Sequence, residues 1–185
     1  MKFSTLFGAI ALTLGVATAA EAADVVYAGE LTPPATQTGS ASGFSWFLDE
    51  GDGVEFWSLY ASAGSTITLQ VDRLEAGFDP VMSIYSGLTT ADTSEFLSFG
   101  DWGGLTFIDY FDDENPAHVE PGPAGDPFGS FVAPTSGFYT IAVGGGLSDD
   151  GGVYAYQISA VPETGTALML GLGLAGLSLL RRRNA

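Results

Sequence analysis

The side chains best suited to metal chemistry are concentrated in one acidic stretch in the second half of the chain. Asp112, Asp113, Glu114 and Asn115 follow one another directly, and Asp126 comes after a proline-containing segment. Calcium is bound in proteins by six to eight oxygen atoms from carboxylates, amide side chains and backbone carbonyls. This stretch supplies such oxygens and is therefore a candidate calcium site. The alternative is an acidic loop that is simply solvated.

Two further acids are weaker candidates for the same site, because they join it only if the fold brings them near. They are Asp79, which opens a predicted strand, and Asp101. Two known calcium motifs do not fit. Residues 49–53 have the wrong order for an EF-hand loop, and residues 144–149 lack the glycine spacing and tandem repetition of the glycine-rich calcium repeat.

Groups for enzymatic catalysis are scarce. The chain has no cysteine, which excludes thiol catalysis and cysteine-based metal sites. Its single histidine, His118, lies in a proline-rich loop without a Gly-x-Ser-x-Gly motif, so no Ser-His-Asp triad is expected. Pairs of carboxylates hydrolyse glycosides when held at a fixed separation, but in so acidic a chain some acids lie close together by chance. We expect a non-enzyme, with an acid-pair glycoside hydrolase as the least favoured alternative.

The distribution of charge excludes one class of partner. Residues 24–160 contain 20 acids and a single basic residue, Arg73, and so carry a net charge of −19. Proteins bind nucleic acid and anionic lipid head groups with Lys and Arg side chains that neutralise the phosphates. Nucleic acid is therefore not a partner. A bound cation would be favourable, because repulsion between like charges destabilises the compact state.

The same region is predicted to be β-structure throughout. Runs of β-branched and aromatic residues recur between clusters of Gly, Pro, Asp and Ser. In residues 66–71 the apolar side chains of Ile67, Leu69 and Val71 alternate with polar ones, which places them on one face of a strand. The fold class is therefore all-β, an antiparallel β-sandwich of eight or nine strands. The predicted strands are 25–31, 44–48, 55–61, 66–71, 81–86, 105–110, 129–133, 138–143 and 153–160.

Aromatic residues offer a second kind of binding chemistry, since an exposed ring can stack on a sugar. Trp102 lies between Asp101 and Gly103-Gly104 in a turn-like setting, which makes it the tryptophan best placed for exposure. It is a candidate ligand-binding residue for carbohydrate. The alternative is core packing, because large aromatic side chains dominate the interiors of β-sandwiches.

Several strand-and-turn segments carry a family resemblance. They are 55–59, 63–69, 78–85, 134–143 and 151–158. These segments resemble the bacterial pre-peptidase C-terminal domain, with a longer segment at 102–127 than is usual there. The resemblance implies a jelly-roll-like sandwich, here residues 23–160, which is not catalytic and which assists secretion or binds a substrate or matrix. It also implies calcium binding in some members, with Asp112 and Asp113 at the acidic turn of the family.

Both ends of the chain have the composition of targeting signals. Lys2 precedes the apolar segment 6–16, and Ala20-Glu21-Ala22 offers a cleavage site, which predicts a signal peptide over residues 1–22. At the other end, Val161-Pro162-Glu163-Thr164-Gly165 leads into an uncharged segment, 164–180. As a helix, this segment would be about 25 Å long, close to the minimum for crossing a bilayer. Three basic residues follow, which would hold that end of a transmembrane helix in the cytoplasm: Arg181, Arg182 and Arg183.

The order of motif, helix and arginines resembles the PEP-CTERM sorting tail of exported bacterial proteins, with Thr164 where the family usually has proline. The resemblance implies that the enzyme exosortase removes the helix and leaves the protein outside the cell. The motif also looks like the Leu-Pro-x-Thr-Gly signal of sortase substrates, and an anchor that is never cut is the third alternative. The expected organisation is a signal peptide at 1–22, the sandwich at 23–160 and a sorting tail at 161–185, with the motif at 161–165, the helix at 164–180 and the basic stop at 181–183.

These features together predict a non-catalytic exported protein of a bacterial cell surface or extracellular matrix. Its tail would hold it transiently in the inner membrane until exosortase acts. The alternative is a calcium-assisted module that binds carbohydrate or another matrix component, with extracellular polysaccharide as its partner. No cofactor other than calcium is expected.

Overall fold

The computed structural model describes residues 24–43, 53–116, 124–146 and 152–163, and in these ranges it contains eleven β-strands and one short 3-10 helix. Some of the predicted features lie outside the described residues. These are the signal peptide, the strand at 44–48, His118 and the tail from Thr164 onward, including Arg181, Arg182 and Arg183. In the described ranges no helix is both long and apolar enough to cross a membrane.

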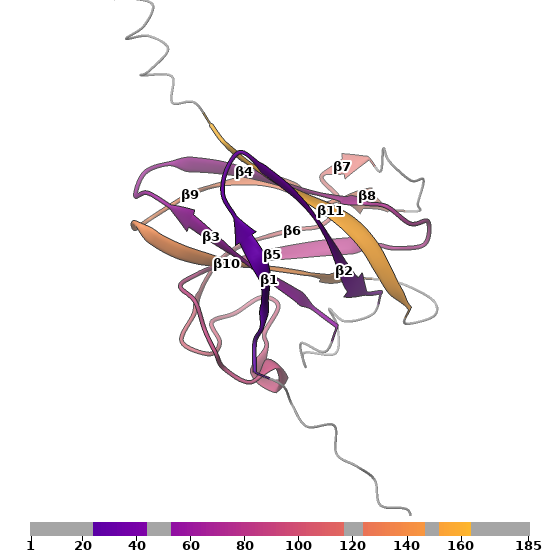
Figure 1. Cartoon of the computed structure of the whole chain (residues 1–185), viewed down its shortest axis with the longest axis horizontal. Helices are drawn as coiled ribbons and strands as arrows, with labels where there is room; N and C mark the ends of the chain where they lie inside the picture. The colour runs from indigo at the N-terminus through magenta and orange to yellow at the C-terminus, as the bar shows by residue number, and fades with distance from the viewer. Residues whose placement is uncertain (1–23, 44–52, 117–123, 147–151, 164–185) are drawn as a thin grey trace, which may run out of the picture.

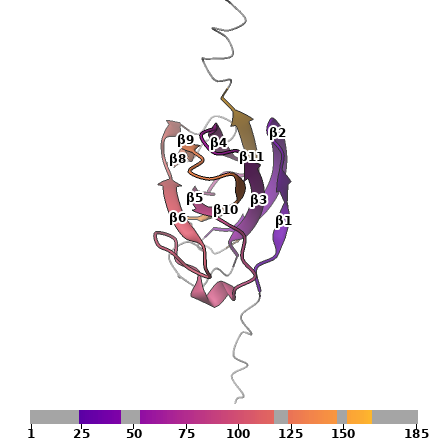
Figure 2. The same ribbon diagram turned by 90° about the vertical axis from the view of Figure 1, so that its left-hand side faces the viewer.

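Nine of the strands form two sheets that lie face to face as the layers of a sandwich (Figures 1 and 2). One sheet has the order β1-β3-β10-β5-β6, the other has the order β2-β11-β4-β9, and the short strands β7 and β8 pair separately. The 3-10 helix, Thr93–Glu95, lies between β5 and β6. The strands are β1 Tyr27–Leu31, β2 Ala35–Ser42, β3 Glu55–Ala61, β4 Thr66–Arg73, β5 Pro80–Ser86, β6 Thr106–Phe111, β7 Asn115–Pro116, β8 Gly125–Asp126, β9 Phe128–Val132, β10 Gly137–Gly145 and β11 Val153–Pro162.

The space between the sheets is filled by alternate side chains of both. Ile67, Leu69 and Val71 of β4 are each exposed by 3% or less, as the sequence alternation predicts. Burying one such side chain contributes about 1.5–3 kcal/mol to folding. The same cluster takes residues from the facing sheet, so the two sheets share one core. Its other large members are Leu31, Trp57, Leu59, Phe78, Met82, Ile84, Phe131, Tyr139, Ile141, Tyr156 and Ile158.

A second apolar cluster lies on the outer face of the five-stranded sheet, under the connection 87–105 between β5 and β6. Phe56 and Trp57 are neighbours in β3 and so point to opposite faces. Both are buried, Trp57 in the central core and Phe56 in this second cluster. The hydroxyl of Tyr85 donates a hydrogen bond to the carbonyl oxygen of Leu97 at 2.7 Å, which ties the connection to the sheet.

Of the two alternatives for Trp102, an exposed ligand-binding ring or core packing, the structure shows core packing. Its side chain is 5% exposed and belongs to the second cluster, where its ring centroid lies 5.3 Å from that of Phe96 and 5.8 Å from that of Phe56. Gly103 and Gly104 follow with φ of 54° and 80°, a conformation that favours glycine, and the turn they form folds the connection back onto the sheet. A ring buried in this way presents no face to a sugar.

The strands agree with the prediction in most places, apart from the unpredicted two-residue strands β7 and β8 and the differences that follow. β3 has the predicted bounds, whereas β2 is absent from the predicted strands because only Ala41 of its eight residues is buried. β11 runs to Pro162, two residues past the predicted end of the sandwich, and pairs there with Ile67 of β4. The expectation of a wholly antiparallel sandwich is wrong for one pair, since β1 and β3 run parallel.

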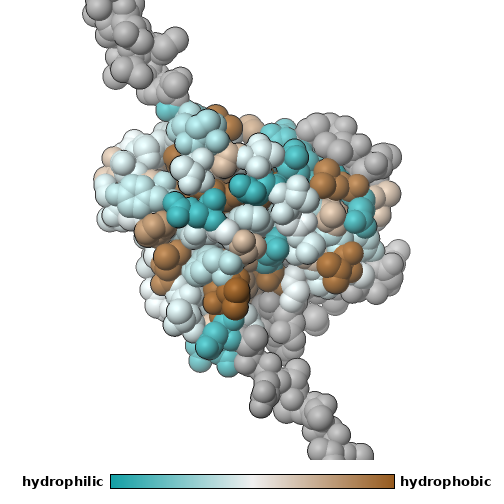
Figure 3. Space-filling model, viewed as in Figure 1, coloured by the Kyte–Doolittle hydropathy of each residue, from teal (hydrophilic) through white to brown (hydrophobic). Residues whose placement is uncertain are grey.

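The outward side chains of the four-stranded sheet are mainly small and polar. Thr68 of β4 and Ser130 of β9 have their hydroxyl oxygens 2.7 Å apart, and Thr36 of β2 and Ser159 of β11 have theirs 3.1 Å apart. On the coloured part of the face seen in Figure 3, apolar residues form separate spots between polar ones. Single apolar residues of this kind are usual on a protein surface.

Candidate metal centre

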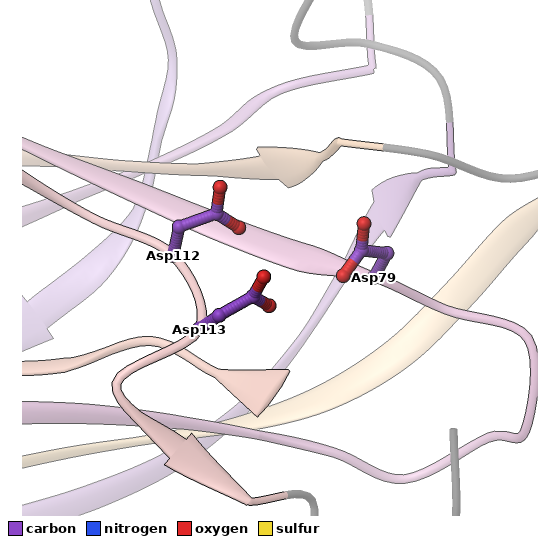
Figure 4. Close-up of side chains that lie close together, drawn as sticks. All are labelled: Asp79, Asp112 and Asp113. Carbon is purple, nitrogen blue, oxygen red and sulfur yellow. The ribbon is translucent and has the colours of Figure 1, made fainter. Parts of the chain in front are cut away.

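Three carboxylates meet at one end of the five-stranded sheet, where β5 begins and β6 ends. Asp79 directly precedes β5, and Asp112 and Asp113 directly follow β6. The two strands are antiparallel neighbours with Met82 opposite Phe111, so the start of one lies beside the end of the other. Figure 4 shows the three carboxylates turned toward one another, and one oxygen of each lies within 4.8 Å of the others.

Hydrogen bonds from neighbouring residues orient the carboxylates of Asp112 and Asp113. The hydroxyl of Tyr110 donates to Oδ2 of Asp112 at 2.7 Å, and the backbone N–H of Gly125 donates to Oδ1 of Asp113 at 2.8 Å. Asp79 is 5% exposed, whereas Asp112 is half-buried and Asp113 is exposed. A carboxylate has about four acceptor positions, so the carboxylates of Asp112 and Asp113 keep oxygen capacity for a cation.

The electrostatics of the group disfavour three negative charges in the absence of a cation. Burial raises the pKa of Asp112, and the charges of Asp113 and Glu114 raise it further, while the hydrogen bond from Tyr110 opposes the shift. The pKa of Tyr110 is also raised, first by burial and then by its hydrogen bond to Asp112. The phenol therefore stays protonated and remains a donor to the carboxylate at neutral pH.

Two of the predicted calcium ligands, Glu114 and Asp126, are not part of this group. Oε2 of Glu114 accepts hydrogen bonds from the backbone N–H of Asp112 at 2.8 Å and of Phe128 at 3.4 Å. Glu114 therefore closes the turn after β6. Asn115 lies in β7, where it pairs with Asp126 of β8.

Asp126 forms a buried ion pair. Its Oδ1 accepts a hydrogen bond from Nε of Arg73 at 2.7 Å, and both side chains are 0% exposed. Burial raises the pKa of Asp126, while the hydrogen bond to Arg73 and its charge oppose the shift. Arg73 is the only basic residue among residues 24–160. The carboxylate of Asp126 therefore serves as the partner of this buried positive charge.

The two weaker candidates have different positions. Asp79 joins the group, whereas Oδ1 of Asp101 accepts a hydrogen bond from the backbone N–H of Phe107 at 2.7 Å and lies outside it. The signal for Asp79 was its place at the start of one strand, opposite the end of another. This position is informative only if β5 is known to pair with β6. The two strands are separated by the long connection 87–105, so their pairing cannot be recognised from the sequence.

The donor set suits a hard divalent cation. All three ligands are carboxylates, and calcium and magnesium prefer oxygen, whereas copper prefers nitrogen and sulfur ligands. The chain has no cysteine, and its one histidine lies outside the described residues.

The first residues of the predicted sorting motif belong to the sheet. Val161 and Pro162 are the last residues of β11, opposite Thr68 and Ile67 of β4. The backbone N–H of Glu163 donates to the carbonyl oxygen of Thr66 at 3.0 Å. The sandwich and the motif therefore overlap at residues 161–163, and Thr164 lies outside the described residues.

No family model and no curated protein matches the sequence. Among solved structures, the fold is similar to CorA of Methylomicrobium album BG8, a surface-associated copper-binding protein, with a TM-score of 0.54, 11% identity and coverage of 76% of this chain and 100% of that one. It is also similar to MopE, a secreted protein of Methylococcus capsulatus in which an oxidised tryptophan facilitates copper binding, with a TM-score of 0.53, 10% identity and coverage of 76% and 92%.

The pre-peptidase C-terminal domain of a collagenase from Bacillus anthracis is a third similar structure, with a TM-score of 0.43, 13% identity and coverage of 73% of this chain and 96% of that one. This TM-score is too low to show a common fold, so the sequence resemblance to that domain family stays a prediction. The likeness to CorA and MopE concerns the fold.

Proposed function

We propose that this chain is an exported, non-catalytic protein of a bacterial cell surface or matrix, and that its sandwich binds one divalent cation through Asp79, Asp112 and Asp113. The observation that carries the proposal is the meeting of these three carboxylates within 4.8 Å. A cation there relieves repulsion inside the group and lowers the net charge of −19 on residues 24–160. CorA, a surface-associated protein, and MopE, a secreted protein, have a similar fold and bind copper.

Calcium is the ion that these ligands fit. Three carboxylates supply up to six oxygens, and water or backbone carbonyls complete the six to eight that calcium takes. Among the described residues, the tryptophan-assisted copper binding named for MopE has no counterpart at this group, since Trp57 and Trp102 are 4% and 5% exposed and lie in the apolar clusters. Extracellular calcium modules bind with a Kd of about 0.1–1 mM, and we expect a value in this range.

Isothermal titration of the metal-free protein with calcium tests the proposal. We expect one site in the wild type and no binding by the double variant Asp112→Asn, Asp113→Asn. The control is Asp109→Asn, which removes one carboxylate charge from an exposed acid that lies in β6 but outside the group, and which should keep the wild-type Kd. Parallel titrations with magnesium and copper identify the ion. A wild type that binds none of the three metals at 10-fold the expected Kd would refute the site.

A second candidate function is calcium-assisted binding of carbohydrate, and one observation favours it. Phe99 is 58% exposed, and its ring centroid lies 4.6 Å from that of Tyr110. The hydroxyl of Tyr110 in turn donates a hydrogen bond to Asp112, so the exposed ring of Phe99 packs against the tyrosine that contacts the carboxylate group. Sugar hydroxyls can complete the coordination of calcium while a ring stacks on Phe99.

A glycan array probed with and without chelator tests this candidate. We expect binding that requires calcium and that is lost in Phe99→Ala, while the calcium Kd of that variant stays unchanged. Glycan binding that persists in chelator would contradict the calcium-assisted mechanism, and the absence of any glycan signal would leave the protein with the cation site alone.

The targeting signals complete the proposal. A signal peptide over 1–22 exports the chain, and the tail 161–185 holds it in the inner membrane until exosortase acts on the motif around Glu163 and Thr164. In Figures 1 and 2 the described chain enters the sandwich at one end, and β11 leaves it at the other. Mass spectrometry of the protein from a host with and without exosortase tests this, and an identical intact C-terminus in both hosts would refute it.

A further inference from the structure

Arg73, the one basic residue among residues 24–160, is entirely buried and makes three polar contacts with one short segment. Its Nε donates a hydrogen bond to Oδ1 of Asp126 at 2.7 Å, and its Nη2 donates to the carbonyl oxygen of Ala124 at 2.9 Å and to that of Gly125. Burying a charge is costly unless it is paired and hydrogen-bonded. The guanidinium therefore binds β8 and the residue before it to the end of β4.

The segment held by Arg73 reaches the metal centre directly. The backbone N–H of Gly125, between two of the atoms that Arg73 binds, donates to Oδ1 of Asp113 at 2.8 Å. The approach is close: a Cβ on Gly125 would lie 2.5 Å from the carbonyl oxygen of Asn115 and 2.7 Å from that of Asp113. A shift of Gly125 must therefore move the carboxylate of Asp113.

We propose that Arg73 is a positioning residue for the cation site, an inference that rests on the proposed function. Arg73 fixes Gly125, and the N–H of Gly125 points the carboxylate of Asp113 toward Asp79 and Asp112. Outer-shell partners of metal ligands act in this way, and their loss weakens metal affinity by about 10–100-fold. The ion pair with Asp126 gives the arrangement a second property, because it neutralises the positive charge that would otherwise repel a cation.

The geometry requires arginine rather than any cation. The three acceptors are a carboxylate and two backbone carbonyls on successive residues, and a planar guanidinium reaches them from two different nitrogens. Lysine is a single point donor on a flexible stem. Arg73→Lys keeps the charge and the ion pair with Asp126 but gives up the simultaneous hold on Ala124 and Gly125.

The test measures calcium affinity and the position of Gly125 together. In Arg73→Lys we expect the calcium Kd to rise at least 10-fold, and the amide signal of Gly125 in the NMR spectrum to lose the calcium response that it shows in the wild type. The matched control is Tyr139→Phe, which removes the buried hydroxyl that donates to Thr135 at the end of β10 that pairs with Ser86, away from Asp79. It should lower the Tm without changing the Kd or the Gly125 response.

Each outcome decides a different point. A Kd for Arg73→Lys within twofold of the wild type would overturn the role of Arg73 while leaving the cation site in place. A lower Tm with an unchanged Kd would show that Arg73 is merely structural, which also overturns it. If Arg73→Lys does not fold, Asp126→Asn is measured by the same criteria. A wild type that binds no calcium refutes the cation site itself, and this inference fails with it.

Discussion

The carboxylate group predicts an unusual pair of effects for Asp112→Asn: the variant should be more stable than the wild type without calcium and less stable with it. One oxygen of each acid lies within 4.8 Å of the others. Two unit charges at that distance repel by about 0.9 kcal/mol in bulk water and about 3.5 kcal/mol at an effective dielectric constant of 20. Because Asp112 is half-buried and Asp113 is exposed, the lower figure applies. Relieving two such repulsions gives about 2 kcal/mol.

The amide keeps an oxygen that accepts the hydrogen bond from Tyr110, so the substitution removes charge without removing that contact. For a domain of this size, about 2 kcal/mol corresponds to a Tm roughly 8 °C higher in chelator. Calcium at 100 times its Kd stabilises the wild type by about 2.7 kcal/mol, and the variant should gain little of this. Thermal melts followed by circular dichroism, in chelator and in calcium, measure both effects, with Asp109→Asn as the charge-matched control.

The pH dependence of folding stability gives independent evidence for the sign of the stability change in Asp112→Asn without calcium. The folded state raises the pKa of Asp112 above its ordinary value of 3.8. Such a group contributes stability at low pH that is lost as the pH rises through the raised pKa. The Tm advantage of Asp112→Asn in chelator should therefore be largest near pH 7 and shrink as the pH is lowered toward 4. A variant no more stable than the wild type in chelator at pH 7, or one that calcium still stabilises fully, would refute the reasoning.

Three further predictions follow from the same structure. The calcium Kd should rise as the pH falls from 7 toward 5, because protons compete for Asp112 at its raised pKa, and titrations at three pH values measure this. A chain ending at Ala160 should have a lower Tm than one ending at Glu163, since it lacks the residues of β11 opposite Thr68 and Ile67; equal Tm values would contradict the observed pairing. Trp102→Ala should cost about 3–5 kcal/mol in urea unfolding and leave the calcium Kd unchanged, whereas a changed Kd with intact stability would point to a role in binding.

A strand could be predicted from the sequence where one of its faces is buried, because apolar and polar residues then alternate with a period of two. β4 was predicted for this reason, and its alternate apolar residues Ile67, Leu69 and Val71 lie in the core as expected. β2 escaped prediction because it is an edge strand with one buried residue. It contains Gly39, which resembles a turn signal but serves another purpose: a Cβ there would lie 2.6 Å from Oη of Tyr156. The glycine leaves space for the side chain of Tyr156, which is in the core. The residues around Gly39 in the sequence do not indicate this contact.

Only those residues of the candidate site that are adjacent in the sequence could be predicted. Asp112 and Asp113 stand out as consecutive acids, and the structure turns both toward a common point. Glu114, although adjacent, turns back to the N–H of Asp112, because a tight turn places successive side chains in different directions. The pairing of β5 with β6 brings Asp79 to the site, and the packing of β4 against β8 brings Arg73 near it. Contacts between residues so distant in sequence depend on topology, which composition and spacing do not contain.

The overlap between sandwich and tail places a physical constraint on the proposed processing. Val161 and Pro162 are paired with β4, the N–H of Glu163 bonds Thr66, and Oε1 of Glu163 accepts a hydrogen bond from Thr68 at 3.2 Å. A sorting enzyme must take its substrate into its own cleft, and these residues are not available to it while they belong to the sheet. A cut after Glu163 leaves every pair of β11 intact, whereas a cut before Val161 removes the last two. The folded sandwich thus favours release at or beyond the bond that follows Glu163, and it keeps its closing strand when the tail is gone.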